Sequence, residues 1–369
     1  MLYQILALAL KEFQAILRDR QSRLVLIGPP IAQLLVFGYA ATFDLNNIPV
    51  AIYNQDNSYL SRELVSHITG SPHFQLVKNI QKDDEIAPLI TTKKALMVVH
   101  IKSDFSTEQA VDYSSKVQVI VDGRNSNTAL LSLNYIRTLL IDFNQQYLND
   151  RGQHPPPAVL EIRSWFNPNL LSRWFIIPGI VALLTLVVPL IVTALSVARE
   201  REAGTFDQIL VTPLSPFQIL VGKSIPGIVI GLVQGTVIIA LTVLWFNIPL
   251  LGSIGTLYLG LTLFLMSTVG IGLMISSLSV TQQQGLMGAF LFLVPAVILS
   301  GFATPIANMP ELVQDLTYIN PMRYFLIIVR GIYLEGNSYG DLVSQFWPMT
   351  LIGLISLTFA GWLFKHRMY

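Results

Sequence analysis

The sequence predicts an α-helical polytopic membrane protein with six transmembrane helices and an α+β domain inserted between helices 1 and 2. Hydrophobic residues make up 52% of the 369 residues, and charged residues only 12%. Six apolar stretches approach the roughly 20 residues that a helix needs to cross the hydrocarbon core. Between the first two stretches lies a long segment whose pattern is that of a folded soluble domain. These three observations place the chain among membrane proteins.

Residues 1–23 predict a helix that lies in the cytoplasmic interface of the membrane. Apolar residues recur every three to four positions, and charged or polar residues occupy the other side. The apolar stripe consists of Leu2, Leu6, Leu10, Phe13 and Leu17, and the polar side of Lys11, Gln14, Arg18 and Asp19. Such a helix either anchors the chain or contacts a partner, and the sequence leaves both readings open.

The six predicted spans contain no Asp, Glu, Lys or Arg. They cover residues 24–43, 174–198, 225–247, 254–278, 286–302 and 346–364. Basic residues precede the first span, lie between the second and third spans, and follow the last one in the tail 365–369. By the positive-inside rule these flanks are cytoplasmic, so both termini are expected inside and residues 44–173 outside.

The exterior segment 44–173 predicts a periplasmic or extracellular α+β domain. Residues 49–56, 94–101 and 116–123 are β-rich runs bounded by turn residues. Polar helical patterns occupy 58–69 and 82–91. A longer helix follows Asn125, Ser126 and Asn127, which can supply its N-cap. The run HPPP at 154–157 ends that helix before the chain returns to the membrane.

Several chemistries are absent from the sequence. The net charge of +1 gives no reason to expect nucleic acid as a partner, and the lack of cysteine excludes disulfides and thiolate metal sites. The five histidines fall at no metal-ligand spacing. Gly222-Lys223-Ser224 resembles the end of a phosphate loop, but Phe217 stands where the first glycine is required. We therefore expect no catalytic residue, metal or cofactor in this chain.

A charged loop at 199–224 is the strongest functional signal. Four charges alternate in sign, Gly204 can close the preceding helix, and Thr205 begins a short helical turn before two prolines redirect the chain. Three apolar side chains are expected to be exposed beside the charges, which favours a docking surface over a solvated topology signal. The predicted coupling residues are Arg199, Glu200, Arg201, Glu202, Gly204, Thr205, Phe206, Ile209 and Leu210.

Two further features concern the spans. Gly227, Gly231 and Gly235 recur every fourth position, which predicts close helix packing either within the subunit or at a dimer seam. Gln33 and Gln234 are polar residues within spans and candidates for a substrate path, although hydrogen bonding between helices explains them as well.

Residues 303–345 predict a re-entrant segment at the outer face. Three prolines interrupt it, and the apolar run 324–334 is short and carries Arg330, so it should not span the membrane. A pair of half-helices is the expected structure.

The uncharged spans also bear on the energy source. Proton- and sodium-coupled carriers place ionisable groups inside the membrane, and the predicted spans have none. Energy is therefore expected to arrive through a protein that docks on the cytoplasmic loop. The alternatives are a secondary carrier or a membrane-anchored sensor that binds a ligand outside, although six spans exceed what an anchor requires.

The residues also carry a family resemblance. The run 198–223, AREREAGTFDQILVTPLSPFQILVGK, resembles the signature loop of type 2 ABC exporter permeases, and 299–325 resembles the segment after their fifth span. The runs PVAIYNQDNS, ALMVVHIKSDFS and VIVDGRNSNTA are similar to the drug-export subgroup with a large domain between spans one and two.

This resemblance implies an exporter permease of the bacterial inner membrane that moves an amphiphilic compound or drug outward. It implies a dimer with an identical or paralogous permease, driven by cytoplasmic ABC ATPase subunits that bind ATP and Mg²⁺. In that family the loop between spans two and three is a coupling helix seated in the ATPase. A periplasmic adaptor protein is a further implied partner.

Overall fold

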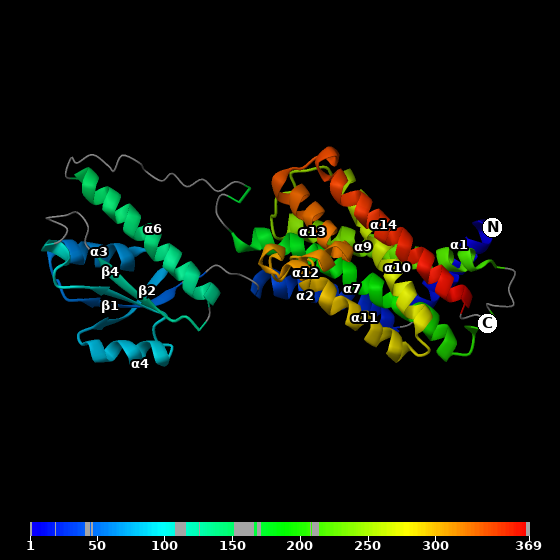
Figure 1. The fold of residues 1–369 in the computed structure, drawn as a ribbon, viewed down its shortest axis with the longest axis horizontal. Coiled ribbons are helices and arrows are strands. Elements are labelled where there is room, and N and C mark those ends of the chain that lie inside the picture. The colour runs from blue at the N-terminus through cyan, green and yellow to red at the C-terminus, as the bar shows by residue number, and fades with distance from the viewer. Residues whose placement is uncertain are drawn as a thin grey trace. The chain divides into compact units, whose positions relative to one another are not determined.

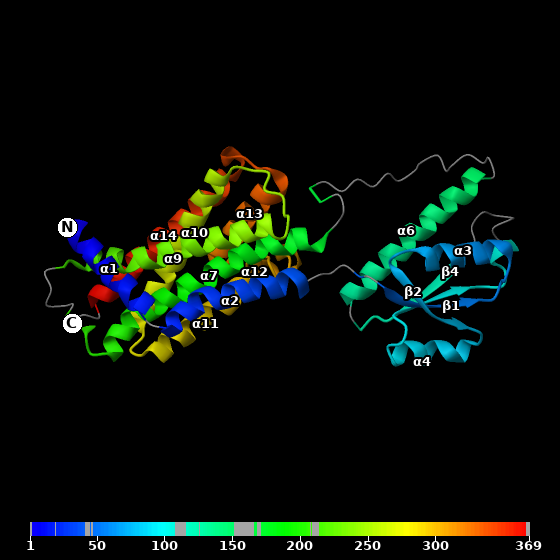
Figure 2. The same ribbon diagram turned by 180° about the vertical axis from the view of Figure 1, so that it is seen from behind.

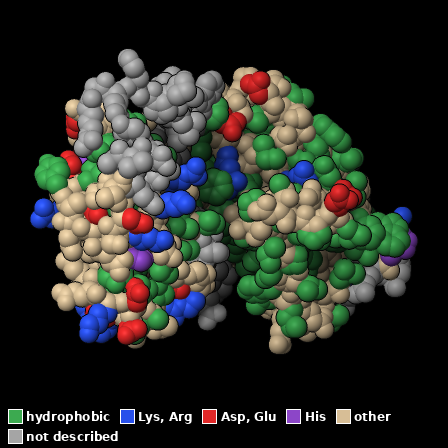
Figure 3. Space-filling model, turned by 60° about the vertical axis from the view of Figure 1, so that its left-hand side comes forward, with side chains coloured by type: hydrophobic (Ala, Val, Ile, Leu, Met, Phe, Trp, Pro, Cys, Tyr) green, Lys and Arg blue, Asp and Glu red, His purple; other side chains and the backbone are tan. Residues whose placement is uncertain are grey.

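The chain folds into two compact units, residues 42–163 and residues 1–41 with 164–369. The computed structural model describes residues 2–18, 20–40, 45, 47–107, 116–124, 126–150, 166–167, 171–206, 208 and 214–366. The two units differ in surface chemistry. Hydrophobic side chains cover much of the visible face of the helical unit, whereas charged side chains are frequent on the smaller unit (Figure 3).

The smaller unit is built on a four-stranded sheet with helices on both faces (Figure 1). The strands lie in the order β2-β1-β3-β4; β1 is parallel to β2 and β3, and β4 is antiparallel to β3. Their bounds are β1 Ile48–Asn54, β2 Phe74–Ile80, β3 Met97–Ile101 and β4 Val117–Val121. Helices α3 (Tyr59–Gly70) and α6 (Ser126–Asp150) cover one face, and α4 (Ile86–Thr91) covers the other.

Alternation along the strands explains the two layers of core. Successive side chains of a strand point to opposite faces. Val50 and Ile52 of β1 therefore pack in the cluster with α3 and α6, while Ala51 and Tyr53 pack in the cluster with α4. The three predicted strands correspond to β1, β3 and β4, and the predicted helices correspond to α3, α4 with the preceding 3₁₀ turn Asp83–Glu85, and α6.

Strand β2 was not predicted from the sequence. It lies at the edge of the sheet, and only its first and last residues, Phe74 and Ile80, are buried. An edge strand exposed along its middle lacks the alternation that identifies a half-buried strand. Its pairing with β1 is a tertiary contact that the local pattern does not contain.

The helical unit holds four helices that are long and apolar enough to cross a membrane, as judged over the described residues. They are α7 (Ser172–Glu202), α9 (Pro216–Leu244), α10 (Ile254–Leu278) and α14 (Tyr339–His366). Two further helices, α2 (Arg20–Ala40) and α11 (Gln282–Ile298), coincide with the predicted first and fifth spans. Helix α1 (Leu2–Arg18) precedes α2 and packs against α9 (Figure 2).

The segment after α11 contains several short helical elements where the sequence predicts a pair of half-helices. They are two 3₁₀ turns, Ile306–Asn308 and Thr317–Ile319, with α12 (Glu311–Leu316), α13 (Pro321–Arg330) and a π-helical turn, Gly331–Glu335. Helix α13 packs against α7, α10 and α14. The hydroxyls of Tyr333 and Thr242 lie 2.7 Å apart, and the Arg330 guanidinium lies 3.9 Å from the centre of the Phe175 ring.

The bounds of α7 and α9 differ from the prediction. Helix α7 continues through Glu202, and α9 begins at Pro216, where Ser215 and Gln218 form a reciprocal capping box. Both the charged start of the predicted loop 199–224 and its Lys223 are therefore helical. The predicted helix ends lie where the apolar residues stop. A helix can continue beyond that point when its charged residues find partners within the protein.

Candidate functional site

The predicted coupling residues begin at a sharply closed helix end. The amide of Thr205 donates to the carbonyl of Glu200 (3.0 Å), and the amide of Gly204 donates to that of Arg201 (3.1 Å). This pair of bonds is a Schellman motif, which needs a left-handed residue after the helix. Gly204 supplies it with a φ of +68°. The sequence prediction that Gly204 closes this helix is confirmed.

A charged cluster of Lys11, Glu12, Glu200 and Lys223 joins this helix end to α1 and α9. The Lys223 ammonium lies 2.7 Å from Glu12 Oε1 and 2.7 Å from Glu200 Oε2. Lys11 approaches the other oxygen of Glu200 at 3.0 Å. Two lysines therefore face two glutamates, and the charged cluster is neutral as a whole.

Burial makes the charged cluster energetically important. Only 1% of the Lys223 side chain is exposed, and 10% of each of the Glu12 and Glu200 side chains. Charges taken out of water need close partners, and removing one member of a buried pair typically costs about 3–5 kcal/mol. Lys223 also donates to Ser196 Oγ at 3.3 Å, so its ammonium has partners on both α1 and α7. The cluster fixes three helices to one another.

Glu200 and Arg201, two of the four alternating charges, are not exposed as a docking surface requires, and Glu202 is exposed but bonded within the chain. Glu200 belongs to the charged cluster. Arg201 donates from one guanidinium nitrogen to the carbonyls of Ser277 (3.0 Å) and Ser279 (3.1 Å) at the end of α10. Glu202 accepts from the first amide of α11, at Gln282 (2.9 Å). Arg199 alone of the four has a side chain with no hydrogen bond or ion pair within the part of the chain that the structure describes.

The expectation that Phe206 is exposed is also wrong. Phe206 is 8% exposed and meets Phe364 of α14 edge-on, with ring centroids 5.6 Å apart. It shares a cluster with Leu8 and Ile219, and the Arg201 guanidinium lies 4.9 Å from its ring centre. The Phe206 ring therefore packs against residues of α1, α9 and α14 next to the end of α7. Thr205 is half-buried and Gln208 is exposed, while Ile209 and Leu210 lie outside the described residues.

Sequence reasoning missed Glu12 and misplaced Lys223. Three residues of the predicted apolar stripe on α1, Leu6, Leu10 and Leu17, are each 52% exposed. A second stripe on the same helix is buried against the protein and includes Glu12; it consists of Leu8, Ala9, Glu12 and Ile16. Its spacing of three to four residues could have identified a second packed face, with a glutamate in it that requires a cation.

The incomplete phosphate loop has a structural role in this structure. A Cβ on Gly222 would lie 2.7 Å from Leu8 Cδ2, so the glycine lets α1 approach α9 closely. Lys223 belongs to the charged cluster, and Ser224 bonds to the carbonyl of Leu220 one turn earlier. The three residues therefore take part in helix packing.

The three glycines at four-residue spacing face the neighbouring helices of the same chain. A Cβ on Gly227 would meet Thr193 and Val269, one on Gly231 would meet Leu265 and Pro189, and one on Gly235 would meet Leu261 and Thr185. These contacts are with α7 and α10. Of the two readings that the sequence left open, packing within the subunit is the one that these contacts match.

The two candidate glutamines differ in their surroundings. Gln33 is exposed on α2. Gln234 is 8% exposed; its Nε2 donates to the Leu184 carbonyl (3.1 Å), and its buried Oε1 accepts no hydrogen bond from the described residues. Gln234 borders a cavity of about 350 Å³ whose other lining residues are all apolar. They are Phe13, Leu17, Leu26, Pro30, Ile31, Val229, Ile230, Val233, Val237 and Ile238.

Comparison with known proteins shows which family and which transporters this chain is similar to. The family described as ABC-2 family transporter protein matches residues 24–364. The chain is 38% identical over 368 residues to the probable multidrug ABC transporter permease YbhR of Escherichia coli, with 100% of both chains covered. It is 33% identical over 340 residues to YbhS of the same organism, also named a probable multidrug ABC transporter permease, with 90% and 89% covered. It is 20% identical over 381 residues to the linearmycin resistance permease protein LnrN of Bacillus subtilis, with 97% and 98% covered.

Proposed function

This chain belongs to the ABC-2 family of transporter proteins and is the membrane permease subunit of an ABC exporter; from that premise we propose that it moves an amphiphilic compound outward. The energy comes from ATP hydrolysed by separate cytoplasmic subunits, which also hold the Mg²⁺. The names of the two Escherichia coli relatives support a drug as cargo. Membership of this family argues against the two alternative functions, a carrier driven by an ion gradient and a membrane-anchored sensor.

The observation that carries the coupling part of the proposal is the charged cluster. It joins the end of α7, the start of α9 and helix α1 through a buried lysine between two carboxylates. Because these three helices are fixed at one point, a push on segment 203–215 reaches α7 and α9 together. An ATPase bound at this segment can therefore shift two long apolar helices as one body.

The proposed docking surface differs from the one expected from sequence. Glu200, Arg201 and Phe206 are used within the chain, so they support the surface from behind, whereas Glu202 is exposed and accepts a hydrogen bond from the Gln282 amide. Of the described residues, the half-buried Arg199 and the exposed Gln208 remain available to a partner. Arg199 gives the surface a positive charge that suits an acidic groove on the ATPase.

The test compares Arg199→Glu with Lys102→Glu, an equal charge reversal at an exposed position of the smaller unit. We expect Arg199→Glu to weaken co-purification of the ATPase by about tenfold or more, because reversing one charge of an interfacial pair costs at least about 1.4 kcal/mol. Substrate-stimulated ATP hydrolysis should fall with it. Normal capture and hydrolysis with Arg199→Glu would refute docking at this surface.

We further propose a permease dimer, identical or paralogous, that uses the free face of α11. Met287, Leu291 and Val294 are 65%, 79% and 54% exposed and lie on one side of that helix. This chain has no cysteine, so Leu291→Cys should cross-link two permeases in the native membrane, whereas Leu354→Cys on α14, at a position that is 51% exposed, should not. Cross-linking at neither position, or only at Leu354→Cys, would contradict the interface. Mass spectrometry of the product separates an identical from a paralogous partner.

The remaining parts of the proposal concern location. We place the protein in the bacterial inner membrane with six spans and both termini in the cytoplasm, and the smaller unit outside, where a periplasmic adaptor protein could reach it. The basic residues that flank the apolar helices support this orientation.

A further inference from the structure

We infer that the smaller unit carries a binding pocket for organic cations, that is, compounds with a positive charge on an aromatic or bulky apolar body. This inference rests on the proposed function in one respect, the amphiphilic nature of the cargo, and it adds the sign of the cargo's charge. It concerns a part of the chain remote in sequence from the coupling residues.

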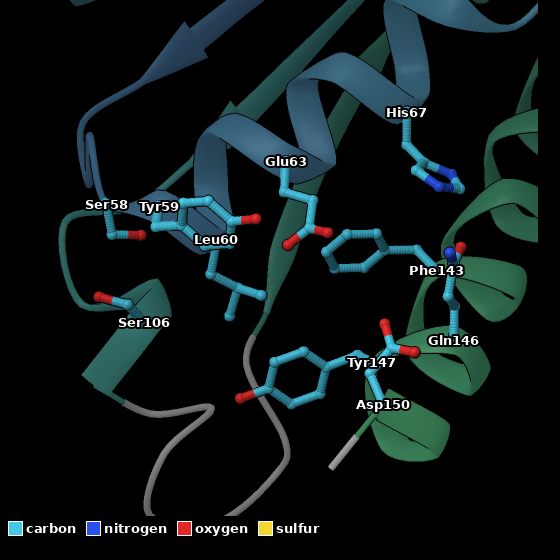
Figure 4. Close-up of a pocket in the computed structure, with 10 residues that line it drawn as sticks. All are labelled: Ser58, Tyr59, Leu60, Glu63, His67, Ser106, Phe143, Gln146, Tyr147 and Asp150. Carbon is cyan, nitrogen blue, oxygen red and sulfur yellow. The ribbon is translucent and has the colours of Figure 1, made fainter.

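The pocket lies between the start of α3 and the end of α6. Its volume is about 410 Å³, a size that suits a drug-sized molecule. Helix α3 and the residue before it contribute Ser58, Tyr59, Leu60, Glu63 and His67; α6 contributes Phe143, Gln146, Tyr147 and Asp150; and Ser106 completes the lining. Figure 4 shows Glu63 projecting from α3 toward Phe143, with Tyr147 and Asp150 projecting from α6 toward the same space.

Aromatic side chains form the apolar part of the pocket. Phe143 is 5% exposed and is held edge-on by His67, with ring centroids 5.6 Å apart. Tyr59 is 75% exposed at the rim, and Tyr147 adds a third aromatic ring. A cation is attracted to the face of such rings, and its apolar body gains by leaving water.

The charge of the lining is negative. Glu63 and Asp150 contribute two carboxylates, and the ten lining residues include no lysine or arginine. The end of α6 strengthens this sign, because a helix C-terminus carries partial negative charge and normally attracts basic residues. Within the described residues, the last turn of α6 has no basic residue and ends in Asp150. A bound cation would offset both the carboxylate and the helix end.

The N-terminus of α3, on the other side of the pocket, does not make the pocket an anion site. The start of α3 would attract one, but the Ser58 hydroxyl already accepts from the amide of Ser61 (3.1 Å). Asp56 lies just before it and accepts a hydrogen bond from the hydroxyl of Ser106 (2.8 Å), which fixes that lining residue. This adds a third carboxylate close to the pocket and leaves the cation as the matching ligand.

The experiment measures binding of tetraphenylphosphonium to the purified full-length permease by calorimetry, with protein-free micelles as the blank. Tetraphenylborate, which has the same shape and the opposite charge, is the second probe. We expect saturable binding of tetraphenylphosphonium and none of tetraphenylborate. The double variant Glu63→Gln/Asp150→Asn should raise the Kd at least tenfold, and Tyr59→Ala should raise it severalfold.

The matched control is Asp104→Asn/Asp142→Asn, which removes two exposed carboxylates of the same unit outside the pocket. It should leave the Kd within twofold of the parent, and thermal unfolding should show that both double variants fold. Equal Kd values for the parent and the pocket variant would overturn the inference, as would equal losses in the pocket and control variants. Saturable binding of tetraphenylborate would do the same.

The outcome is separable from that of the proposed function. Capture of the ATPase is measured with Arg199→Glu, which leaves the pocket untouched, and cation binding is measured without ATP. If the pocket variant loses cation binding and Arg199→Glu loses ATPase capture, both proposals stand. If Arg199→Glu leaves ATPase capture unchanged while the pocket binds as expected, only the docking proposal fails.

Discussion

At the scale of single residues, Lys223 shows how a local motif can mislead. In the sequence it follows a glycine and precedes a serine, as in a phosphate loop, but in the structure its ammonium lies between the carboxylates of Glu12 and Glu200. A lysine with 1% of its side chain exposed is tolerable only because two carboxylates approach it within 2.7 Å.

The corresponding prediction is that Lys223→Met destabilises the permease by about 3–5 kcal/mol, because the buried Glu12 carboxylate then loses its cation and Glu200 keeps only the more exposed Lys11. Lys11→Met should cost at most about 1 kcal/mol, since 55% of that side chain is exposed. Thermal unfolding in detergent measures both. Neutralising the cluster with Glu12→Gln/Glu200→Gln/Lys223→Met should recover much of the loss, and a triple variant less stable than Lys223→Met would contradict the account.

Asp56 provides a residue-scale prediction about pH. Burial raises the pKa of its carboxyl, but hydrogen bonds from Ser58 and Ser106 outweigh burial and hold the pKa below its ordinary value. A folded-state pKa below the unfolded one stabilises the fold at neutral pH, and this contribution disappears as the pH falls from about 4 through the folded pKa. Asp56→Asn should therefore be less stable than the parent at pH 7, with the difference shrinking below about pH 4. Denaturant unfolding of the two proteins across pH 3–7 checks this, and a gap that widens in acid would contradict it.

At the scale of elements, close helix contacts depend on where glycine replaces a side chain. A Cβ on Gly285 of α11 would lie 2.7 Å from the carbonyl oxygen of Ala194 on α7. That oxygen is backbone within a long helix, so it cannot move away as a flexible side chain could.

We therefore predict that Gly285→Ala separates α11 from α7 and costs about 1–3 kcal/mol, the usual range for overpacking. Gly255→Ala on α10 is the control, because a Cβ there would meet only Ser253 Oγ at 3.6 Å. That control should be neutral or slightly stabilising, since alanine favours helix over glycine. Unfolding midpoints in detergent measure both, and equal midpoints for Gly285→Ala and the parent would show that α11 can adjust.

At the scale of the whole molecule, the chain combines a charged α+β unit with an apolar helical unit. Each has its own core: one lies on both faces of the sheet, and the other is centred on α7 and α10. This division matches a chain in which one unit contacts water and the other contacts lipid. It leads to a prediction about the two sides of the membrane.

Cysteines placed at Ser66 and Gln208, both exposed, should react with membrane-impermeant maleimide from opposite faces of the membrane. Ser66 lies in the smaller unit and should react in intact spheroplasts, whereas Gln208 should react only after the membrane is opened. The chain has no cysteine of its own, so the parent protein is the blank. Reaction of both positions from one side would contradict the proposed topology.

The class of protein, most of its elements and its family could be predicted from the sequence, because these depend on local properties. Hydropathy located the long apolar helices, alternation located β1, β3 and β4, and Gly204 marked the end of α7. The family pattern was also readable, since the charged loop and the segment after α11 are contiguous runs of sequence.

Only the tertiary structure decided what the charged residues do. Glu12, Glu200 and Lys223 are far apart in the chain, and a charge pattern read along one helix cannot show which partner another helix brings. Phe206 was expected to be exposed because its neighbours are polar, but α14 supplies Phe364 to cover it. The edge strand β2 and the pocket between α3 and α6 arise in the same way. Burial is set by what packs against a residue, and that information is distributed over the whole chain.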